Sequence, residues 1–136
     1  MKTLTVPAST DQLDTVQSFI DELLSTVPCS PETQIQLQIA VEELFVNIAH
    51  YAYSPEIGEA VISCNVDQTP PSITIQFRDR GTPFNPLAKE DADISLSVEE
   101  RGIGGLGIFM VKDYMDAVDY AYEDGQNILT IRKQLS

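Results

Sequence analysis

The sequence contains no tryptophan, a single histidine, two cysteines and few basic residues. Eight lysines and arginines stand against 21 aspartates and glutamates, which gives a formal net charge of −13. An acidic surface of this kind repels a phosphate backbone, so we expect no direct binding of nucleic acid. Cys29 and Cys64 follow no metal-binding or redox spacing, and we expect both to be reduced thiols.

Long apolar runs are also missing. No stretch approaches the roughly 20 apolar residues that a helix needs to cross a membrane, and the first residues lack the apolar core of a signal peptide. We therefore expect a cytoplasmic protein with no membrane contact. Hydrophobic residues make up 43% of the 136 positions, which suits one hydrophobic core, and we expect a single domain over residues 1–136.

Hydrophobic spacing predicts a strand and a helix at the start of the chain. Polar and apolar residues alternate over residues 2–7, which indicates a short strand. An apolar stripe over residues 11–27 predicts a helix that begins at a cap, Ser9 or Thr10, and stops at Pro28.

A second helix is predicted to begin at Ser30, because a capping serine followed by Pro31 and an early acid is typical of a helix start. We expect this helix to run to about Tyr51. The residues that we expect it to bury are Ile35, Ile39, Leu44 and Ile48.

The second half of the chain contains short strands, turn residues and one more helix. The expected elements are strands over 59–66 and 72–78, a helix over 105–115, and strands over 117–123 and 126–133. An Asp-Gly hairpin turn joins the last two strands. Residues 87–100 have no clear period, and we expect a lid over a ligand there rather than a plain surface loop. This order predicts an α+β fold, a two-layer α/β sandwich whose mixed, mostly antiparallel sheet carries its helices on one face.

Within the second helix, Glu43 and Asn47 lie four residues apart and therefore share one face. A carboxylate can accept a proton, and an amide oxygen can bind a hard cation such as Mg²⁺. The spacing alone is weak, since it occurs by chance on many helices. Glu42 is an alternative proton acceptor if the helix register differs.

Two glycine-bearing segments follow downstream. Asp79 ends an apolar strand in the run Asp-Arg-Gly-Thr-Pro-Phe-Asn-Pro, and its carboxylate either caps the turn before Gly81 or faces a cavity, where it needs a donor. The second segment opens a helix, and its backbone N–H groups can face a polyphosphate. Its residues of interest are Arg101, Gly102, Gly104, Gly105 and Gly107.

The three motifs together describe a nucleotide site, and in this order they resemble the Bergerat ATP-binding fold shared by gyrase, heat-shock chaperones, histidine kinases and MutL. Over essentially its whole length, the chain is most similar to the small anti-sigma-factor serine kinases of the RsbW type. The resemblance implies ATP and Mg²⁺ as cofactors and serine/threonine protein kinase activity.

The resemblance also implies a role for each motif residue. Glu43 matches a general base, Asn47 a magnesium ligand, and Asp79 the acceptor for the adenine amino group. Gly81 lets the backbone approach the adenine ring, and Asn127 stands where relatives often have a threonine near the adenine. The glycine-rich segment is expected around the phosphates, with Arg101 near the γ-phosphate.

The partners implied by the resemblance are an anti-anti-sigma protein of the STAS fold, which is phosphorylated, and a sigma factor, which is bound and inhibited. A homodimer is compatible with it. Two departures stand out. The helix over 11–27 has no lysine or arginine where relatives often use an arginine for partner contacts, which makes a different regulatory partner plausible. Tyr51 stands where many relatives have histidine, and His50, one place early, is expected either at the surface or just behind the residues that contact the ligand, rather than as a catalyst.

Other functions fit the three motifs less well or only in part. A non-catalytic module that sequesters a partner in an ATP-dependent way is the main alternative, although the intact Glu43 favours an enzyme. A histidine kinase fits poorly because no phosphoacceptor helix pair precedes the motifs, and a gyrase-like clamp needs a transducer domain. No lysine or arginine lies between Lys2 and Arg78. Three interpretations of this asymmetry stay open: a solvated acidic face, positive charge in the second half beside a bound triphosphate, or an acidic surface for a basic protein partner.

Overall fold

The computed structural model describes residues 1–52, 58–83, 85 and 105–135. Its strands are β1 (Lys2–Pro7), β2 (Glu59–Gln68), β3 (Pro71–Asp79), β4 (Ala117–Glu123) and β5 (Gln126–Gln134). Its α-helices are α1 (Leu13–Leu24), α2 (Pro31–Asn47) and α4 (Gly105–Tyr114), with a 3-10 turn at Thr10–Gln12 and a π-helical turn at Ile48–Ala52. The element order agrees with the order predicted from the sequence.

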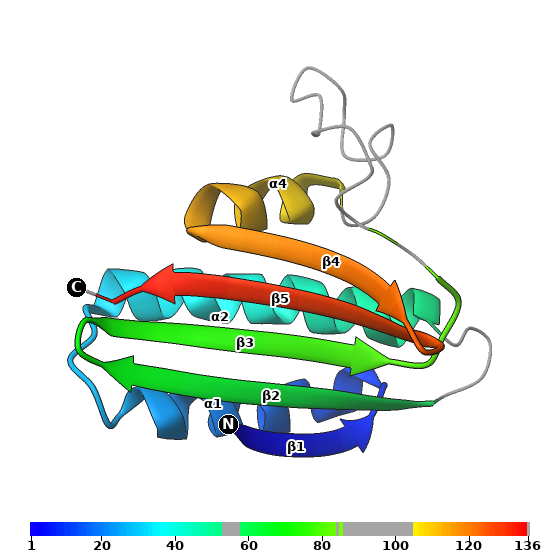
Figure 1. Cartoon of the computed structure of the whole chain (residues 1–136), viewed down its shortest axis with the longest axis horizontal. Coiled ribbons are helices and arrows are strands. Elements are labelled where there is room, and N and C mark those ends of the chain that lie inside the picture. Colours follow the sequence, from blue (N-terminus) through cyan, green and yellow to red (C-terminus); the bar gives the residue numbers. More distant parts are fainter. Residues whose placement is uncertain (53–57, 84, 86–104, 136) are drawn as a thin grey trace.

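The five strands form one sheet in the order β1-β2-β3-β5-β4, and every pairing in it is antiparallel. Helices α1 and α2 lie behind the sheet in Figure 1, and α4 packs against α2. The predicted α+β sandwich is therefore confirmed, with its helices in one layer. This layering follows from alternation along the strands, because one side of each strand is apolar and needs a cover.

The hydrophobic core lies between the sheet and the helices. On β2 and β3 the helix-facing side chains include Ile62, Cys64, Ile75 and Phe77, all of them buried. The helices contribute Val16, Ile20, Leu37, Val41, Leu44, Phe45 and Val111. A shared core of this kind fixes the ends of α2 and β3 relative to each other, which matters for the site described below.

The start of α2 confirms the sequence prediction. Ser30 is the N-cap, and its side-chain oxygen accepts a hydrogen bond from the backbone N–H of Thr33 at 3.1 Å, with Pro31 at the first helical position. At α1 the prediction was less accurate. Ser9 precedes the 3-10 turn without a side-chain capping bond. The helix ends at Leu24, because the Thr26 hydroxyl and backbone take up a carbonyl oxygen of its last turn, that of Leu23.

The predicted burial of Ile35 is wrong, since this side chain is 55% exposed. The buried stripe of α2 runs through Leu37, Ala40, Val41, Leu44 and Phe45. Ile35 lies two positions before the first of these, about 200° around the helix axis, and therefore faces outward. Leu44 is buried as predicted, and Ile39 and Ile48 are partly buried.

The β4–β5 hairpin has the predicted two-residue turn. Asp124 and Gly125 have φ angles of 53° and 75°, the left-handed values that an Asp-Gly hairpin turn requires. The turn fixes the register of the two strands, which places Tyr122 opposite Asn127 and Tyr120 opposite Leu129.

Candidate functional site

The end of α2, the end of β3 and the start of α4 lie toward the same end of the molecule (Figure 1). These three segments are far apart in the sequence and carry the three motifs. Gly105 and Gly107 lie in the first turn of α4. Arg101, Gly102, Gly104 and the expected lid over 87–100 lie outside the described residues.

Glu43 and Asn47 occupy the last turns of α2, and both are half-buried. The Asn47 side-chain nitrogen donates a hydrogen bond to Glu43 Oε1 at 3.3 Å. This bond uses the nitrogen, so the Asn47 carbonyl oxygen remains as an acceptor for a cation. Glu42 is exposed, and therefore lies on the outer side of the helix.

Burial raises the pKa of the Glu43 carboxyl above the ordinary value for glutamate. The hydrogen bond from Asn47 lowers the pKa, and the nearby charge of Glu42 raises it, both by less than burial does. A glutamate whose pKa is shifted toward neutrality is a better proton acceptor than a fully solvated one.

A π-helical turn, Ile48–Ala52, follows Asn47 directly. The backbone N–H of Ile48 is shared between the carbonyl oxygens of Leu44 and Phe45, as is common at the end of an α-helix. Such turns often occur at functional sites. His50 is exposed in this turn, as expected from the sequence.

Asp79 lies at the end of β3, between Ala60 of β2 and Asn127 of β5, and is only 6% exposed. Its Oδ1 atom accepts hydrogen bonds from the Gly81 backbone N–H and from the Asn127 side-chain nitrogen, each at 2.9 Å. The first bond is the turn cap that the sequence raised as one alternative. No donor among the described residues reaches Oδ2, so this buried carboxylate keeps one oxygen for a ligand.

Asn127 holds the loop after β3 against β5. Its side-chain nitrogen also donates to the carbonyl oxygens of Thr82 at 3.0 Å and Gly81 at 3.4 Å. The Tyr120 hydroxyl donates to the Asn127 side-chain oxygen. Asn127 was expected near the site, but Tyr120 was missed. The register of the predicted hairpin was the available signal, since it places both side chains on one face of the sheet.

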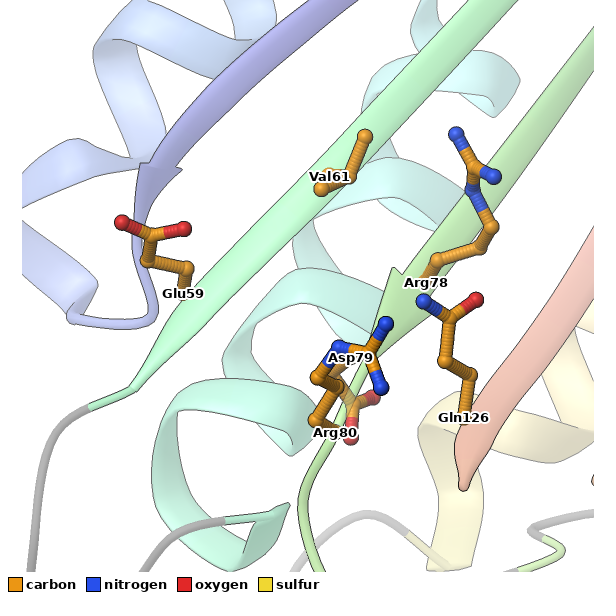
Figure 2. Close-up of a pocket in the computed structure, with 6 residues that line it drawn as sticks. All are labelled: Glu59, Val61, Arg78, Asp79, Arg80 and Gln126. Atoms are coloured by element: carbon orange, nitrogen blue, oxygen red, sulfur yellow. The ribbon is translucent and has the colours of Figure 1, made fainter. Parts of the chain in front are cut away.

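The sheet face away from the helices carries a pocket of about 390 Å³ (Figure 2). Its lining residues are Glu59, Val61, Arg78, Asp79, Arg80 and Gln126. Val61 and Arg78 are opposite each other and alternate with the helix-facing Ile62 and Phe77. The pocket therefore reaches the strand end that carries Asp79, which is one of the motif residues, whereas Glu43 and Asn47 are not among its lining residues.

Within the part of the chain that the structure describes, no group of three or more His, Cys, Asp or Glu side chains is placed to hold a metal ion. Across those same residues, no helix has both the length and the apolar character to cross a membrane.

Comparisons with known proteins show which proteins this chain is similar to. The serine-protein kinase RsbW of Listeria monocytogenes is 26% identical over 132 residues, which cover 93% of this chain and 83% of that protein. The serine/threonine-protein kinase BtrW of Bordetella bronchiseptica is 26% identical over 102 residues, 75% of this chain and 71% of that protein.

Among solved structures, the RsbU and RsbW domains of Rv1364c from Mycobacterium tuberculosis match 99% of this chain with a TM-score of 0.64 at 13% identity. This chain spans 33% of that longer chain. The likeness confirms the fold. Residues 6–133 match the family described as the histidine kinase-like ATPase domain, and the chain belongs to that family.

Proposed function

We propose that this chain is an ATP-dependent serine/threonine protein kinase of a partner-switching regulatory system. Its substrate is a serine or threonine hydroxyl of a STAS-type anti-anti-sigma protein, and its second role is to sequester a sigma factor. The family match and the kinase names of its relatives support this class. The observation that carries the proposal is the half-buried Glu43 beside Asn47, a base next to a cation ligand.

The adenine end of ATP is proposed to lie at Asp79. The open Oδ2 atom accepts a hydrogen bond from the amino group of the base, while Oδ1 is already held by Gly81 and Asn127. Gly81 has no side chain, so the base can approach the backbone there. In this proposal Arg101, Gly102, Gly104, Gly105 and Gly107 surround the phosphates.

The residues present also fit a magnesium ion at the other end of the nucleotide. Asn47 is the proposed protein ligand, through the side-chain oxygen that does not face Glu43. When bound with the triphosphate, the ion partly neutralises its negative charge.

Glu43 is proposed as the general base. It accepts the proton of the partner hydroxyl as the hydroxyl oxygen bonds to the γ-phosphorus and the bond from that phosphorus to the leaving ADP breaks. A positioned base of this kind contributes about 10²–10⁴-fold to the rate. The bond from Asn47 orients the carboxylate, and burial keeps its pKa raised.

The proposal can be tested by measuring the transfer of label from γ-labelled ATP to a purified STAS-type protein. Glu43→Ala is expected to keep ATP affinity and to lose phosphorylation by about 10²–10⁴-fold. Glu42→Ala is the matched control, because it removes a neighbouring carboxylate that is exposed, and it is expected to keep activity. Equal losses in the two variants would contradict the assigned base.

The second candidate is a non-catalytic module that captures its partner only when ATP is bound. It differs from the kinase in one measurable way. If the wild-type chain retains a STAS partner in the presence of Mg-ATP but transfers no label to it, the binding module is the correct function.

A further inference from the structure

Tyr120 lies in β4 and is connected to the proposed adenine site by its contact with Asn127. Its hydroxyl donates to the Asn127 side-chain oxygen, and the tyrosine side chain is half-buried. Asn127 is 6% exposed and touches both Asp79 and the loop that follows β3. Tyr120, seven residues before Asn127 in the sequence, therefore contacts the residue that donates a hydrogen bond to Asp79, the proposed acceptor for the adenine amino group.

The contacts around Asn127 determine which way its amide points. Its nitrogen faces three acceptors, Asp79 Oδ1 and the carbonyl oxygens of Thr82 and Gly81. Its oxygen faces the Tyr120 hydroxyl. The reversed amide would place an acceptor oxygen against a carboxylate and two carbonyl groups, which leaves one consistent orientation.

This orientation sets the hydrogen-bonding character of the pocket edge. The N–H groups of Asn127 point at Asp79 and the loop, and so face away from a purine bound at Oδ2. The group that such a purine meets is then a carboxylate oxygen, which only accepts. A purine with an amino group at this position is bound, and a purine with a keto oxygen is repelled.

We propose that Tyr120 is a positioning residue that determines base specificity, because its hydroxyl locks the Asn127 amide and keeps Asp79 selective for adenine over guanine. This inference rests on the proposed binding of ATP at Asp79. Without the hydroxyl, the Asn127 oxygen loses this donor, so turning the amide nitrogen away from the Thr82 carbonyl oxygen costs less free energy. A donor then becomes available to a keto oxygen, so the penalty against guanine falls.

The experiment measures calorimetric affinities for Mg-ATP and Mg-GTP with the whole chain and two variants. In Tyr120→Phe the ratio of the two affinities is expected to fall on the order of tenfold, the size of about one net hydrogen bond. Tyr122→Phe is the matched control. Tyr122 lies two residues further along β4, and its side chain is 46% exposed and makes no hydrogen bond in the described part of the chain, so this ratio should stay at the wild-type value.

A double-mutant cycle separates positioning from general stability. Asn127→Ser is expected to lower the same ratio, and Tyr120→Phe is expected to lower it no further in that background, because the proposed effect of the hydroxyl on the bound purine passes through the Asn127 amide. Asn127→Ser also keeps the test decisive if Tyr120→Phe is unstable, because an unchanged ratio in Asn127→Ser overturns the inference.

The outcomes distinguish this inference from the function beneath it. If the wild-type chain binds no Mg-ATP, the proposed function fails first. If it binds Mg-ATP and Tyr120→Phe keeps the wild-type ratio, or if the two substitutions have additive effects, the function stands and the role given to Tyr120 is wrong.

Discussion

Asp79 is an acid held on the core side of a sheet, where a carboxylate is stable only if donors meet it. Two donors bond to Oδ1, the backbone of Gly81 and the side chain of Asn127, and Oδ2 receives none from the described residues. Oδ1 therefore takes part in hydrogen bonds within the protein, and Oδ2 is open to a ligand. The two oxygens of one residue serve the fold and the proposed base site separately.

Asp79→Asn tests this division. The amide replaces an ionised acceptor by a group that can also donate, so we expect Mg-ATP affinity to fall by at least about tenfold, since a hydrogen bond to a charged group contributes about 1.5–3 kcal/mol. Calorimetry measures this. Asp119→Asn, at an exposed position of β4, is the control and should bind as the wild type does.

The raised pKa of Glu43 predicts a pH dependence of phosphotransfer. The base acts only when ionised, so the rate should fall as the pH drops through a value above that of an ordinary glutamate. Phosphotransfer rates measured at saturating ATP locate the pH at which the rate falls. The measurements should cover about pH 4 to pH 8, the range over which a glutamate with a raised pKa titrates. A pH-rate profile that stays flat down to the ordinary glutamate pKa would count against Glu43.

The same shift links Glu43 to stability. A folded-state pKa above the unfolded value means that the folded chain binds the proton more tightly, so this contribution to stability is complete at low pH and is lost as the pH rises through the folded pKa. At neutral pH, Glu43→Gln should therefore unfold at a slightly higher urea concentration than the wild type, while losing phosphotransfer.

Glu43 and Asn47 lie in the last turns of helix α2, so the way this helix begins and ends affects where their side chains lie. At its start, Ser30 supplies a capping oxygen and Pro31 the first helical residue. At its far end the helix widens into a π-turn just after Asn47. The first feature was predictable from local residue types, whereas the second depends on packing and has no local signature in the sequence.

Ser30→Ala should lower the free energy of unfolding by about 1 kcal/mol, because the Thr33 N–H loses its capping partner. Urea unfolding measures the change. Ser18→Ala changes an exposed serine inside α1, where alanine is a better helix former, and should leave stability unchanged or slightly raised. A similar loss in both variants would indicate that the cap contributes little.

The order and type of the elements could be predicted because each segment has its own period and its own turn residues. The Asp124-Gly125 turn even fixed the strand register correctly. Ile35 was misplaced because α2 has apolar residues around much of its circumference, so periodicity alone did not identify the buried side. The end of α1 was misjudged because Val27 is buried although it lies beyond the helix.

The candidate site was predictable in its parts and less so in its connections. Glu43, Asn47 and Asp79 follow from motif spacing and a family resemblance. The bond from Asn127 to Asp79 joins residues 48 positions apart, and it exists only because β3 and β5 are neighbours in the sheet. Strand order of this kind is set by the whole fold, so the Tyr120, Asn127 and Asp79 contacts needed the structure.

At the scale of the whole molecule, the net charge of −13 is a source of self-repulsion. Added salt screens this repulsion, and the screening length falls from about 30 Å at 0.01 M to about 8 Å at 0.15 M. We expect the midpoint of thermal unfolding to rise by a few degrees over that range of sodium chloride. A midpoint that falls would show that favourable ion pairs outweigh the repulsion.

The carboxyl-terminal hairpin has a consequence for the newly made chain. The wall of the proposed adenine site is complete only when β5 has docked beside β3 and brought Asn127 to Asp79. A nascent chain whose β5 is still inside the ribosome can therefore already contain helix α2, but it lacks the contact between Asn127 and Asp79 at the proposed adenine site. Retention of ATP would then begin only after β5 has been made and has paired with β3.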